Sequence, residues 1–442
     1  MRFVQITPGS GDSFYCENCL RDLDMVRALQ GCGLDVVMVP LYLPVGAVQD
    51  VPIFFGGINV FLQQKLSVFR RTPRWVDRWF DSRRLLRWAG RKAGMTSARD
   101  LGETTMSMLQ GRDGRQVKEL NRLIEWLALE ENRPDVVCLS DALLLGLAPT
   151  LRERLRVPVI CLLQDEDGFV DGLGRPYAEQ VWDLMQQRGR DVDGFVAVSR
   201  FYGDLMKARL AIPDEKLHVV PMGIPIDRYP PASAPSQVPA IGFLSRQYPS
   251  RGLDTLVDAF ILLKKQDRFR RVRLHVGGGR SPADKPFIKT MCHRLAEAGA
   301  LDDVTFSTDF SLEARLEFLR GLTLLAVPEK TPVAYGLYVL EALACGVPVV
   351  EPAIGVFPEI LEQTGGGILY QDNTAKGLAT ALEALVADPD QAVRLGRQGR
   401  EGVRRHYDVN QSAGRMLELC LQLTGGDRLD RDRVHSGQIS PR

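Results

Sequence analysis

Short apolar runs alternate with amphipathic stretches along the first 200 residues, and this alternation predicts buried strands separated by helices. Near-continuous apolar strands are typical of a parallel sheet that helices cover on both faces. The predicted strands are 3–7, 35–40, 135–140, 157–163 and 194–199. Repetition of strand and helix predicts an α/β, doubly wound domain over residues 1–228.

A second domain is predicted after a change in composition. Residues 229–239 hold four prolines and no charge, which is typical of a semi-rigid linker. The alternation then restarts and predicts a domain over 240–405. Its strands are expected at 240–244, 272–276, 303–306, 323–327, 347–350 and 367–370, and its helices near 252–265, 283–298, 311–320, 335–345 and 374–387.

The end of the chain is predicted to differ from both domains. A last helix is expected over about 409–424, within a segment 406–425 that follows the second sheet. The tail 426–442 is polar and is expected to be disordered. Two such sheets in tandem predict a cleft between their carboxyl ends, where ligands of open α/β sheets bind.

Composition narrows the class of protein. Of the 442 residues 45% are apolar, which is enough for full-sized cores. Lys and Arg number 56 against 55 Asp and Glu, so no nucleic-acid partner is expected. No run approaches the ~20 apolar residues of a membrane span. The first residues of the sequence contain too few consecutive apolar residues for the apolar region of a secretory signal peptide. The eight cysteines are scattered, as in a reduced cytoplasmic enzyme.

The segment 331–352 carries the first candidate site. A helix is predicted from Tyr335 or Gly336 to a glycine C-cap at Gly346. Backbone N–H groups at a helix start favour a phosphate. The candidates for that contact are Ala334, Tyr335, Gly336 and Leu337.

Glu341 lies on the same helical face as Leu337, so its carboxylate is directed towards a core. Such a carboxylate is costly to bury unless its oxygens accept hydrogen bonds. Ribose hydroxyls would serve as donors. The alternative is a glutamate that reaches solvent at the edge of the face or pairs with an arginine.

Arg246 and Arg251 form a second candidate element between a predicted strand and a helix. Two guanidinium groups at a strand's carboxyl end can bind a diphosphate bidentately. The alternative is a pair of solvated loop arginines. Together with the helix start and Glu341, the pair predicts a nucleoside-diphosphate site.

These residues resemble the donor domain of the family-4 retaining glycosyltransferases of the GT-B fold. The family's Arg-x4-Lys-Gly element is similar to Arg246 through Arg251-Gly252, with arginine in place of lysine. Its Glu-x7-Glu signature is similar to the segment around Tyr335-Gly336-Leu337, and its second glutamate matches Glu341. The resemblance is strong over 240–405 and weaker over 1–225.

The resemblance implies two Rossmann-like domains that face each other across a cleft. It implies a nucleoside-diphosphate sugar as donor, bound through its diphosphate by Arg246 and Arg251 and through its ribose by Glu341. It also implies that the final helix returns to the first domain, which would then be the acceptor side.

The chain departs from the family pattern in two places. Val333 stands where the first signature glutamate is expected, which leaves both the sugar and turnover open. Relatives often have a histidine near the sugar in the first domain, whereas all five histidines here lie at 218 or beyond. At the corresponding strand end, residues 164–167 are polar, and Asp165 is the candidate for substrate binding. The alternative is a solvated acidic loop.

Gly9 and Gly11 follow the first predicted strand and would let the backbone approach a phosphate or sugar. A plain tight turn is the alternative. Cys16 and Cys19 form a lone C-x-x-C, for which structural thiols are the better interpretation.

The predicted chemistry is transfer of a hexose, with retention, to an unidentified acceptor hydroxyl. Arg246 and Arg251 would stabilise the charge on the departing diphosphate. No cofactor is expected, and no metal, since the histidines show no ligand spacing. Two alternatives remain: a binding or regulatory protein that keeps the donor site without turnover, and a nucleotide-sugar epimerase.

An insertion is predicted in the first domain over about 56–130. Within it, residues 70–92 carry nine basic and two acidic residues together with three tryptophans. Basic residues interleaved with aromatics suit an anionic membrane surface or a lipid-linked acceptor. The alternative is an insertion whose tryptophans pack on the domain while its arginines are solvated.

Overall fold

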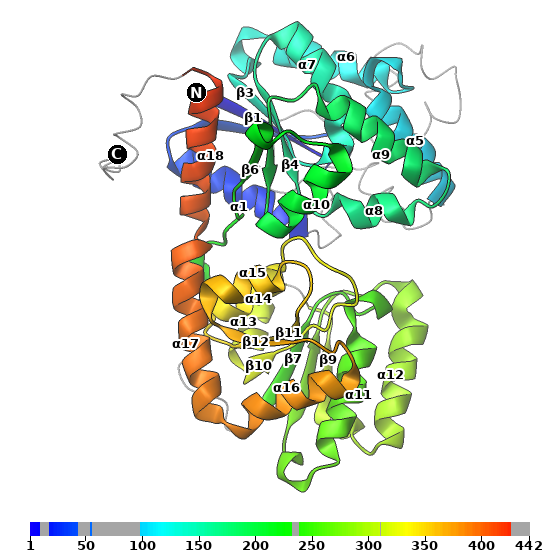
Figure 1. Cartoon of the computed structure of the whole chain (residues 1–442), viewed down its shortest axis with the longest axis vertical. Coiled ribbons are helices and arrows are strands. Elements are labelled where there is room, and N and C mark those ends of the chain that lie inside the picture. The colour runs from blue at the N-terminus through cyan, green and yellow to red at the C-terminus, as the bar shows by residue number, and fades with distance from the viewer. Residues whose placement is uncertain (9–16, 43–53, 55–97, 232–237, 310, 426–442) are drawn as a thin grey trace. The chain divides into compact units, whose positions relative to one another are not determined.

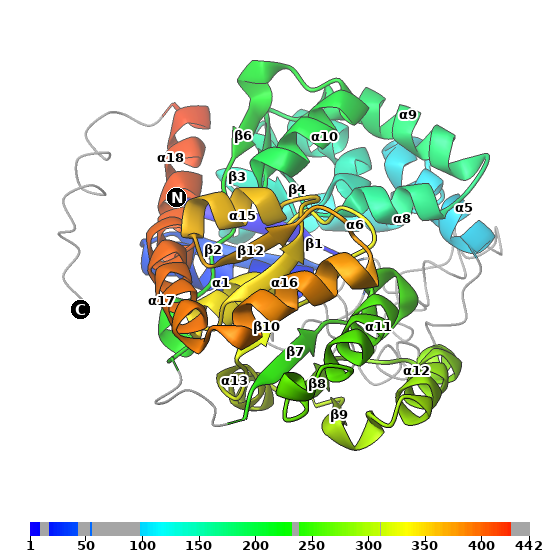
Figure 2. The same ribbon diagram turned by 60° about the horizontal axis from the view of Figure 1, so that its bottom comes forward.

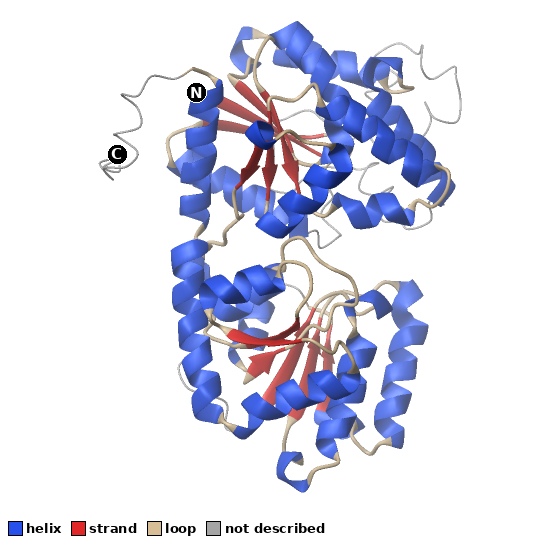
Figure 3. Cartoon of the chain, viewed as in Figure 1, coloured by secondary structure: helices blue, strands red, loops and turns tan. Residues whose placement is uncertain are grey.

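The computed structural model describes residues 1–8, 17–42, 54, 98–231, 238–309 and 311–425. The chain divides into two compact units. Unit 1 comprises Met1–Met222 and the segment that begins at Asn410, and unit 2 comprises Gly223–Val409. Each unit is an α/β layer structure in which helices flank a parallel sheet (Figures 1 and 3).

The described strands of unit 1 form a parallel sheet in the order β2-β1-β3-β4-β5-β6. Its central strands β3, β4 and β5 are buried along their whole length, because apolar residues point to both covered faces. The strands are β1 (Arg2–Thr7), β2 (Asp35–Pro40), β3 (Val136–Leu139), β4 (Val159–Leu163), β5 (Gly194–Ala197) and β6 (Leu217–Val219).

The described helices of unit 1 cover that sheet. They are α1 (Glu17–Gly31), α5 (Ala98–Gln110), α6 (Val117–Leu127), α7 (Ala148–Leu155), α8 (Glu166–Gly172), α9 (Tyr177–Gly189), α10 (Arg200–Leu210) and α18 (Val409–Leu423). Of the predicted insertion, α5 and α6 are described; α5 packs against α9, and the ring centroid of Trp126 in α6 lies 5.4 Å from that of Phe54. Residues 70–92 lie outside the described residues.

Unit 2 has a parallel sheet in the order β12-β11-β10-β7-β8-β9. Its strands are β7 (Ala240–Leu244), β8 (Arg273–Gly277), β9 (Val304–Ser307), β10 (Leu324–Leu325), β11 (Val349–Pro352) and β12 (Gly367–Tyr370). β10 is shorter than the predicted strand 323–327. The backbone N–H of Val327 leaves the strand ladder and donates instead to the Glu351 side chain at 3.3 Å.

The helices of unit 2 are α11 (Leu253–Lys264), α12 (Lys285–Glu297), α13 (Leu312–Arg320), α14 (Leu337–Ala344), α15 (Phe357–Thr364), α16 (Ala375–Ala387) and α17 (Pro389–His406). α11 and α16 pack side by side along the sheet in both views (Figures 1 and 2). Side-chain oxygens of Ser311, Thr374 and Asp388 accept backbone N–H groups at the starts of α13, α16 and α17, which explains where these helices begin.

The division between the units falls before the proline-rich segment, whereas a linker is predicted at 229–239. Residues from Gly223 onwards already pack in unit 2. Ile224 pairs with Asp408, and its backbone exchanges hydrogen bonds of 2.8 and 3.1 Å with Tyr407 and Val409. Residues 232–237 and the predicted disordered tail 426–442 lie outside the described residues.

α17 is a helix that the sequence pattern does not predict. Its packing face is made by glycines at 396, 399 and 402, which read as helix breakers in a sequence. A Cβ at Gly396 would lie 2.0 Å from the Gly346 carbonyl oxygen, and one at Gly402 would lie 2.4 Å from the Cα of Thr364. The glycines therefore allow α17 to approach the end of α14 and α15 closely.

Among the described helices, none combines the length and the apolar character that a membrane crossing requires.

Candidate functional site

The candidate donor site lies at the point where the strand order of the unit 2 sheet reverses. β7 and β10 are neighbours there, and the chain proceeds from them to opposite sides of the sheet. Ligands of open α/β sheets bind outside the carboxyl ends of the strands at this point. The segment after β7 carries Arg246 and Arg251, and the segment after β10 leads to α14.

Arg246 is half-exposed and lies near a buried carboxylate. Its Nη2 is 3.4 Å from Oδ2 of Asp284, and its guanidinium lies over the Tyr248 ring at 4.7 Å. Burial would raise the pKa of Asp284, but hydrogen bonds from Ser281 and the Arg246 charge outweigh it and lower that pKa. Asp284 is therefore an anion that orients Arg246.

Arg251 pairs with a different carboxylate. Its Nη1 donates to Oε1 of Glu329 at 2.8 Å, and its side chain is 26% exposed while that of Glu329 is 1% exposed. Gly252 follows with a φ of +75°, and a Cβ there would lie 1.8 Å from the Pro328 carbonyl oxygen. This close approach needs glycine and brings the β7 and β10 segments together.

α14 begins at Leu337, one residue after the later of the two predicted starts. Gly336 is the N-cap residue with a φ of +70°, and the helix ends before a second left-handed glycine at Gly346. The side chains of Ala334, Tyr335 and Leu337 are buried. Contact with a phosphate would therefore be made by backbone N–H groups at the start of the helix rather than by these side chains. The Val339 N–H already donates to the Gly336 carbonyl oxygen at 3.0 Å.

Glu341 lies inside unit 2 and its side chain is 1% exposed. Its Oε1 is 2.9 Å from Nη1 of the buried Arg315 and accepts the Tyr229 hydroxyl at 2.8 Å. Of the interpretations given for Glu341, this geometry favours the one in which the glutamate pairs with an arginine. The ribose contact stays a prediction.

Val333 is buried as well, at 7% exposure, and its carbonyl accepts the Val356 N–H at 3.1 Å. The position of the missing signature glutamate therefore presents an apolar side chain that is packed within unit 2.

In unit 1, Asp165 is an exposed residue between β4 and α8. Its φ of +89° is in the left-handed region, which non-glycine residues adopt at a cost and often at functional sites. Gln164 and Glu166 on either side are buried, so Asp165 alone of these three side chains is exposed. Gly9, Gly11 and Cys16 lie outside the described residues.

Glu166 holds this turn in place. It accepts the Tyr202 hydroxyl at 2.7 Å and the backbone N–H groups of Ala142 and Gln164 at 2.9 and 2.8 Å. Burial raises the pKa of Glu166, and these hydrogen bonds limit the rise. The Asp165 backbone is thus fixed by β4, the segment after β3 and α10.

Two family models match consecutive parts of the chain. The family described as glycosyl transferases group 1 matches residues 229–402, and the one described as glycosyltransferase family 4 matches residues 105–228. The chain belongs to the family-4 glycosyltransferases.

Curated relatives match this chain in sequence over part of its length. A GDP-mannose-dependent alpha-(1-6)-phosphatidylinositol monomannoside mannosyltransferase of Mycobacterium tuberculosis is 27% identical over 47% of this chain and 56% of the relative. A D-inositol 3-phosphate glycosyltransferase of Xylanimonas cellulosilytica is 29% identical over 48% of this chain and 52% of the relative. The chain thus spans about half the length of these relatives.

Solved structures establish the fold of the family-4 chain. Sucrose-phosphate synthase from Thermosynechococcus elongatus has a TM-score of 0.71 at 17% identity, covering 97% of this chain and 100% of its own. Anabaena HepE in complex with UDP has a TM-score of 0.69 at 14% identity, covering 96% and 100%. With its two Rossmann-like units, the chain has the GT-B fold.

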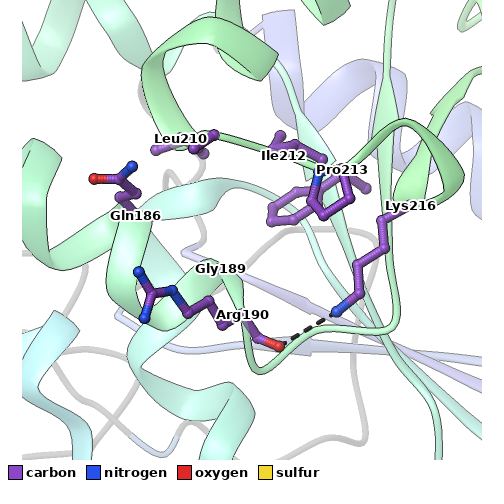
Figure 4. Close-up of a pocket in the computed structure, with 9 residues that line it drawn as sticks. Gln186, Gly189, Arg190, Leu210, Ile212, Pro213 and Lys216 are labelled. Atoms are coloured by element: carbon purple, nitrogen blue, oxygen red, sulfur yellow. Dashed lines mark hydrogen bonds between the residues drawn. The ribbon is translucent and has the colours of Figure 1, made fainter.

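A cavity of about 240 Å³ lies in unit 1, whereas the predicted donor-site residues Arg246, Arg251 and Glu341 belong to unit 2 (Figure 4). It is lined by the ends of α9 and α10 and by Phe195 near the start of β5, so it lies at the amino edge of the sheet. The Lys216 amine beside it donates to the carbonyl oxygens of Arg190 and Val192 at 3.3 and 2.7 Å. The cavity therefore lies at the edge of the sheet opposite the carboxyl ends of the strands, where ligands of open α/β sheets bind.

The candidate donor-site residues have partners that sequence reasoning missed. Glu329, Asp284 and Arg315 were not singled out, since each acts through a residue distant in sequence. Glu329 directly follows Pro328, just after the predicted strand 323–327, which is the one signal that could have drawn attention to it. Within the described parts of the chain, no three His, Cys, Asp or Glu side chains gather as metal ligands.

Proposed function

We propose that this chain transfers a hexose, with retention, from a nucleoside-diphosphate sugar to an acceptor hydroxyl. The observation that carries the proposal is the placement of two arginines and a helix start on the two strands that flank the switch point of one sheet. Relatives support the donor class, since one is named as GDP-mannose-dependent and Anabaena HepE was solved with UDP and glucose. A carbohydrate or a lipid-linked sugar is the proposed acceptor.

The proposed reaction exchanges one bond at the anomeric carbon. The bond to the diphosphate oxygen breaks, and the bond to the acceptor oxygen forms on the same face. The acceptor proton passes to the departing phosphate oxygen, so that no protein base is required. Arg246, Arg251 and the first backbone N–H groups of α14 would stabilise the negative charge that develops on the diphosphate.

Arg246→Ala tests the donor site. We expect it to weaken the binding of UDP or GDP about 10- to 100-fold, as the loss of a charge-assisted contact does. Arg294→Ala is the matched control, because Arg294 is 43% exposed and pairs with Asp258 at 3.2 Å on the outer helices. Equal affinity of Arg246→Ala and the wild type for every nucleoside diphosphate would refute the donor site.

Turnover is tested with a panel of nucleotide sugars. A transferase should slowly release nucleoside diphosphate without acceptor, and should give a product with the donor's anomeric configuration by NMR. Activity should persist in EDTA, since the proposal uses no metal. An inverted product or complete loss of activity in EDTA would contradict these points.

A binding protein without turnover is the second candidate, and Val333 favours it. The buried valine supplies no carboxylate where the family pattern has one. Tight donor binding with no diphosphate release under any condition would support this candidate, and altered sugar stereochemistry in the free nucleotide sugar would support an epimerase.

A further inference from the structure

Glu329 joins three segments at the carboxyl edge of the unit 2 sheet. It lies after β10 and is 1% exposed, and its Oε1 accepts both Nη1 of Arg251 at 2.8 Å and the Tyr338 hydroxyl at 3.1 Å. Arg251 follows β7 and Tyr338 belongs to α14, so these contacts connect both arms of the switch point. Nothing in the proposed chemistry assigns a role to Glu329.

The backbone of Glu329 is also held in place. Its carbonyl oxygen accepts the Asn373 amide at 2.8 Å, and the Tyr370 hydroxyl donates to Oδ1 of the same asparagine at 3.1 Å. Glu329 is therefore a rigid acceptor rather than a mobile loop residue. A flexible arginine bound to such an acceptor loses much of its rotamer freedom before any ligand arrives.

A second carboxyl group adjoins this pair. Glu351 on β11 is fully buried; its Oε1 accepts the Val327 N–H, and its Oε2 has no hydrogen-bond partner among the residues described. Burial, and then the negative charge of Glu329, raise the pKa of Glu351 well above its usual range. The surroundings of Glu351 therefore favour the uncharged form of this carboxyl group beside the Arg251–Glu329 ion pair.

The Arg251 guanidinium can serve two acceptors. Its Nη1 contacts the buried Glu329, while the Arg251 side chain as a whole is 26% exposed. A guanidinium carries five N–H donors in a fixed fork and can bind a carboxylate and a phosphate together.

We propose that Glu329 is a positioning residue for the donor, which holds Arg251 in the orientation that binds the diphosphate. This inference rests on the proposed function. The Tyr338 hydroxyl on α14 donates to the same Glu329 oxygen that binds Arg251. In this proposal Glu329 therefore aligns both Arg251 and the start of α14 with the donor diphosphate.

The test compares Glu329→Ala and Glu329→Gln by calorimetric titration with UDP and GDP. Glu329→Ala should weaken nucleoside-diphosphate binding about tenfold, because Arg251 regains its rotamer freedom. Glu329→Gln keeps an acceptor oxygen and should restore affinity to within about threefold of the wild type. In an Arg251→Ala background, Glu329→Ala should have no further effect on affinity.

Glu119→Ala is the matched control. Glu119 on α6 is fully buried and binds the partly exposed Arg122 at 2.8 Å, which reproduces the same kind of pair in unit 1. This variant should lower thermal stability but leave nucleoside-diphosphate affinity unchanged.

The outcomes separate this inference from the proposed function. Wild-type affinity in Glu329→Ala, or a Glu329→Gln as weak as Glu329→Ala, would overturn the positioning role while the donor site stands. An equal loss of affinity in Glu119→Ala would overturn it too, because stability alone would then explain the effect. A wild-type protein that binds no nucleoside diphosphate would refute the proposed function itself, and this inference with it.

Discussion

Glu351→Gln should make the stability of the protein less dependent on pH. The glutamate is fully buried, and burial together with the nearby Glu329 charge raises its pKa, so the folded protein keeps a proton that the unfolded chain loses above about pH 4.3. A group whose pKa is raised by folding stabilises the protein fully at low pH, and that stabilisation is lost as pH rises towards the folded-state pKa. Glutamine has nearly the same shape and no such proton.

The expected magnitude follows from the single proton. For each pH unit over which the folded protein holds it and the unfolded chain does not, the free energy of unfolding falls by about 1.4 kcal/mol. In Glu351→Gln this contribution is absent. The melting temperature of the variant should therefore gain about 3–6 °C on the wild type for each pH unit above about pH 5, until the pH reaches the folded-state pKa of Glu351.

The assay is thermal unfolding of both proteins at half-unit pH steps. A constant offset between the two curves would reflect packing of the amide alone, so the slope of the difference is the diagnostic quantity. Glu401→Gln is the control, since it removes a side chain that is 61% exposed on α17 and does not touch the buried pair. A difference in melting temperature between Glu351→Gln and the wild type that stays constant with pH would show that folding does not raise the pKa of Glu351.

Three further predictions concern other parts of the chain. Glu341→Gln should cost about 3–5 kcal/mol of stability in denaturant titrations, because it leaves the buried Arg315 without its anion; unchanged stability with weaker nucleotide binding would support the ribose contact instead. Tyr202→Phe should cost about 1–3 kcal/mol, since Glu166 loses a buried 2.7 Å hydrogen bond; a smaller loss would show that the other donors suffice. If residues 70–92 contact membranes, anionic liposomes should sediment the protein in a salt-sensitive manner; no sedimentation at low salt would remove that interpretation.

The strands and most helices of unit 2 could be predicted because their signals are local. Apolar runs bounded by glycine and proline mark β7, β11 and β12, and Gly336 and Gly346 bracket α14. The sequence pattern does not predict α17, because glycines on the packing face of a helix look the same in a sequence as glycines that break a helix. The tertiary neighbours that make them useful are not visible locally.

The candidate site could be predicted only as far as single residues. Arg246 and Arg251 do lie after β7, at the strand end where they were expected. Their partners could not be foreseen, because Arg251 and Glu329 are 78 positions apart and meet only through the order of the strands. The partners of Glu341 could not be foreseen for the same reason. Its carboxylate was expected to need hydrogen-bond donors, and it finds Arg315 and Tyr229 inside the protein.

The most direct test of the central claim compares diphosphate with monophosphate binding. Calorimetric titration of the wild type with UDP and UMP, and with GDP and GMP, measures what the second phosphate contributes. We expect the wild type to bind each diphosphate more tightly than its monophosphate, and this preference to fall about 10-fold or more in Arg246→Ala and Arg251→Ala. Equal preferences in the wild type and both variants would contradict it.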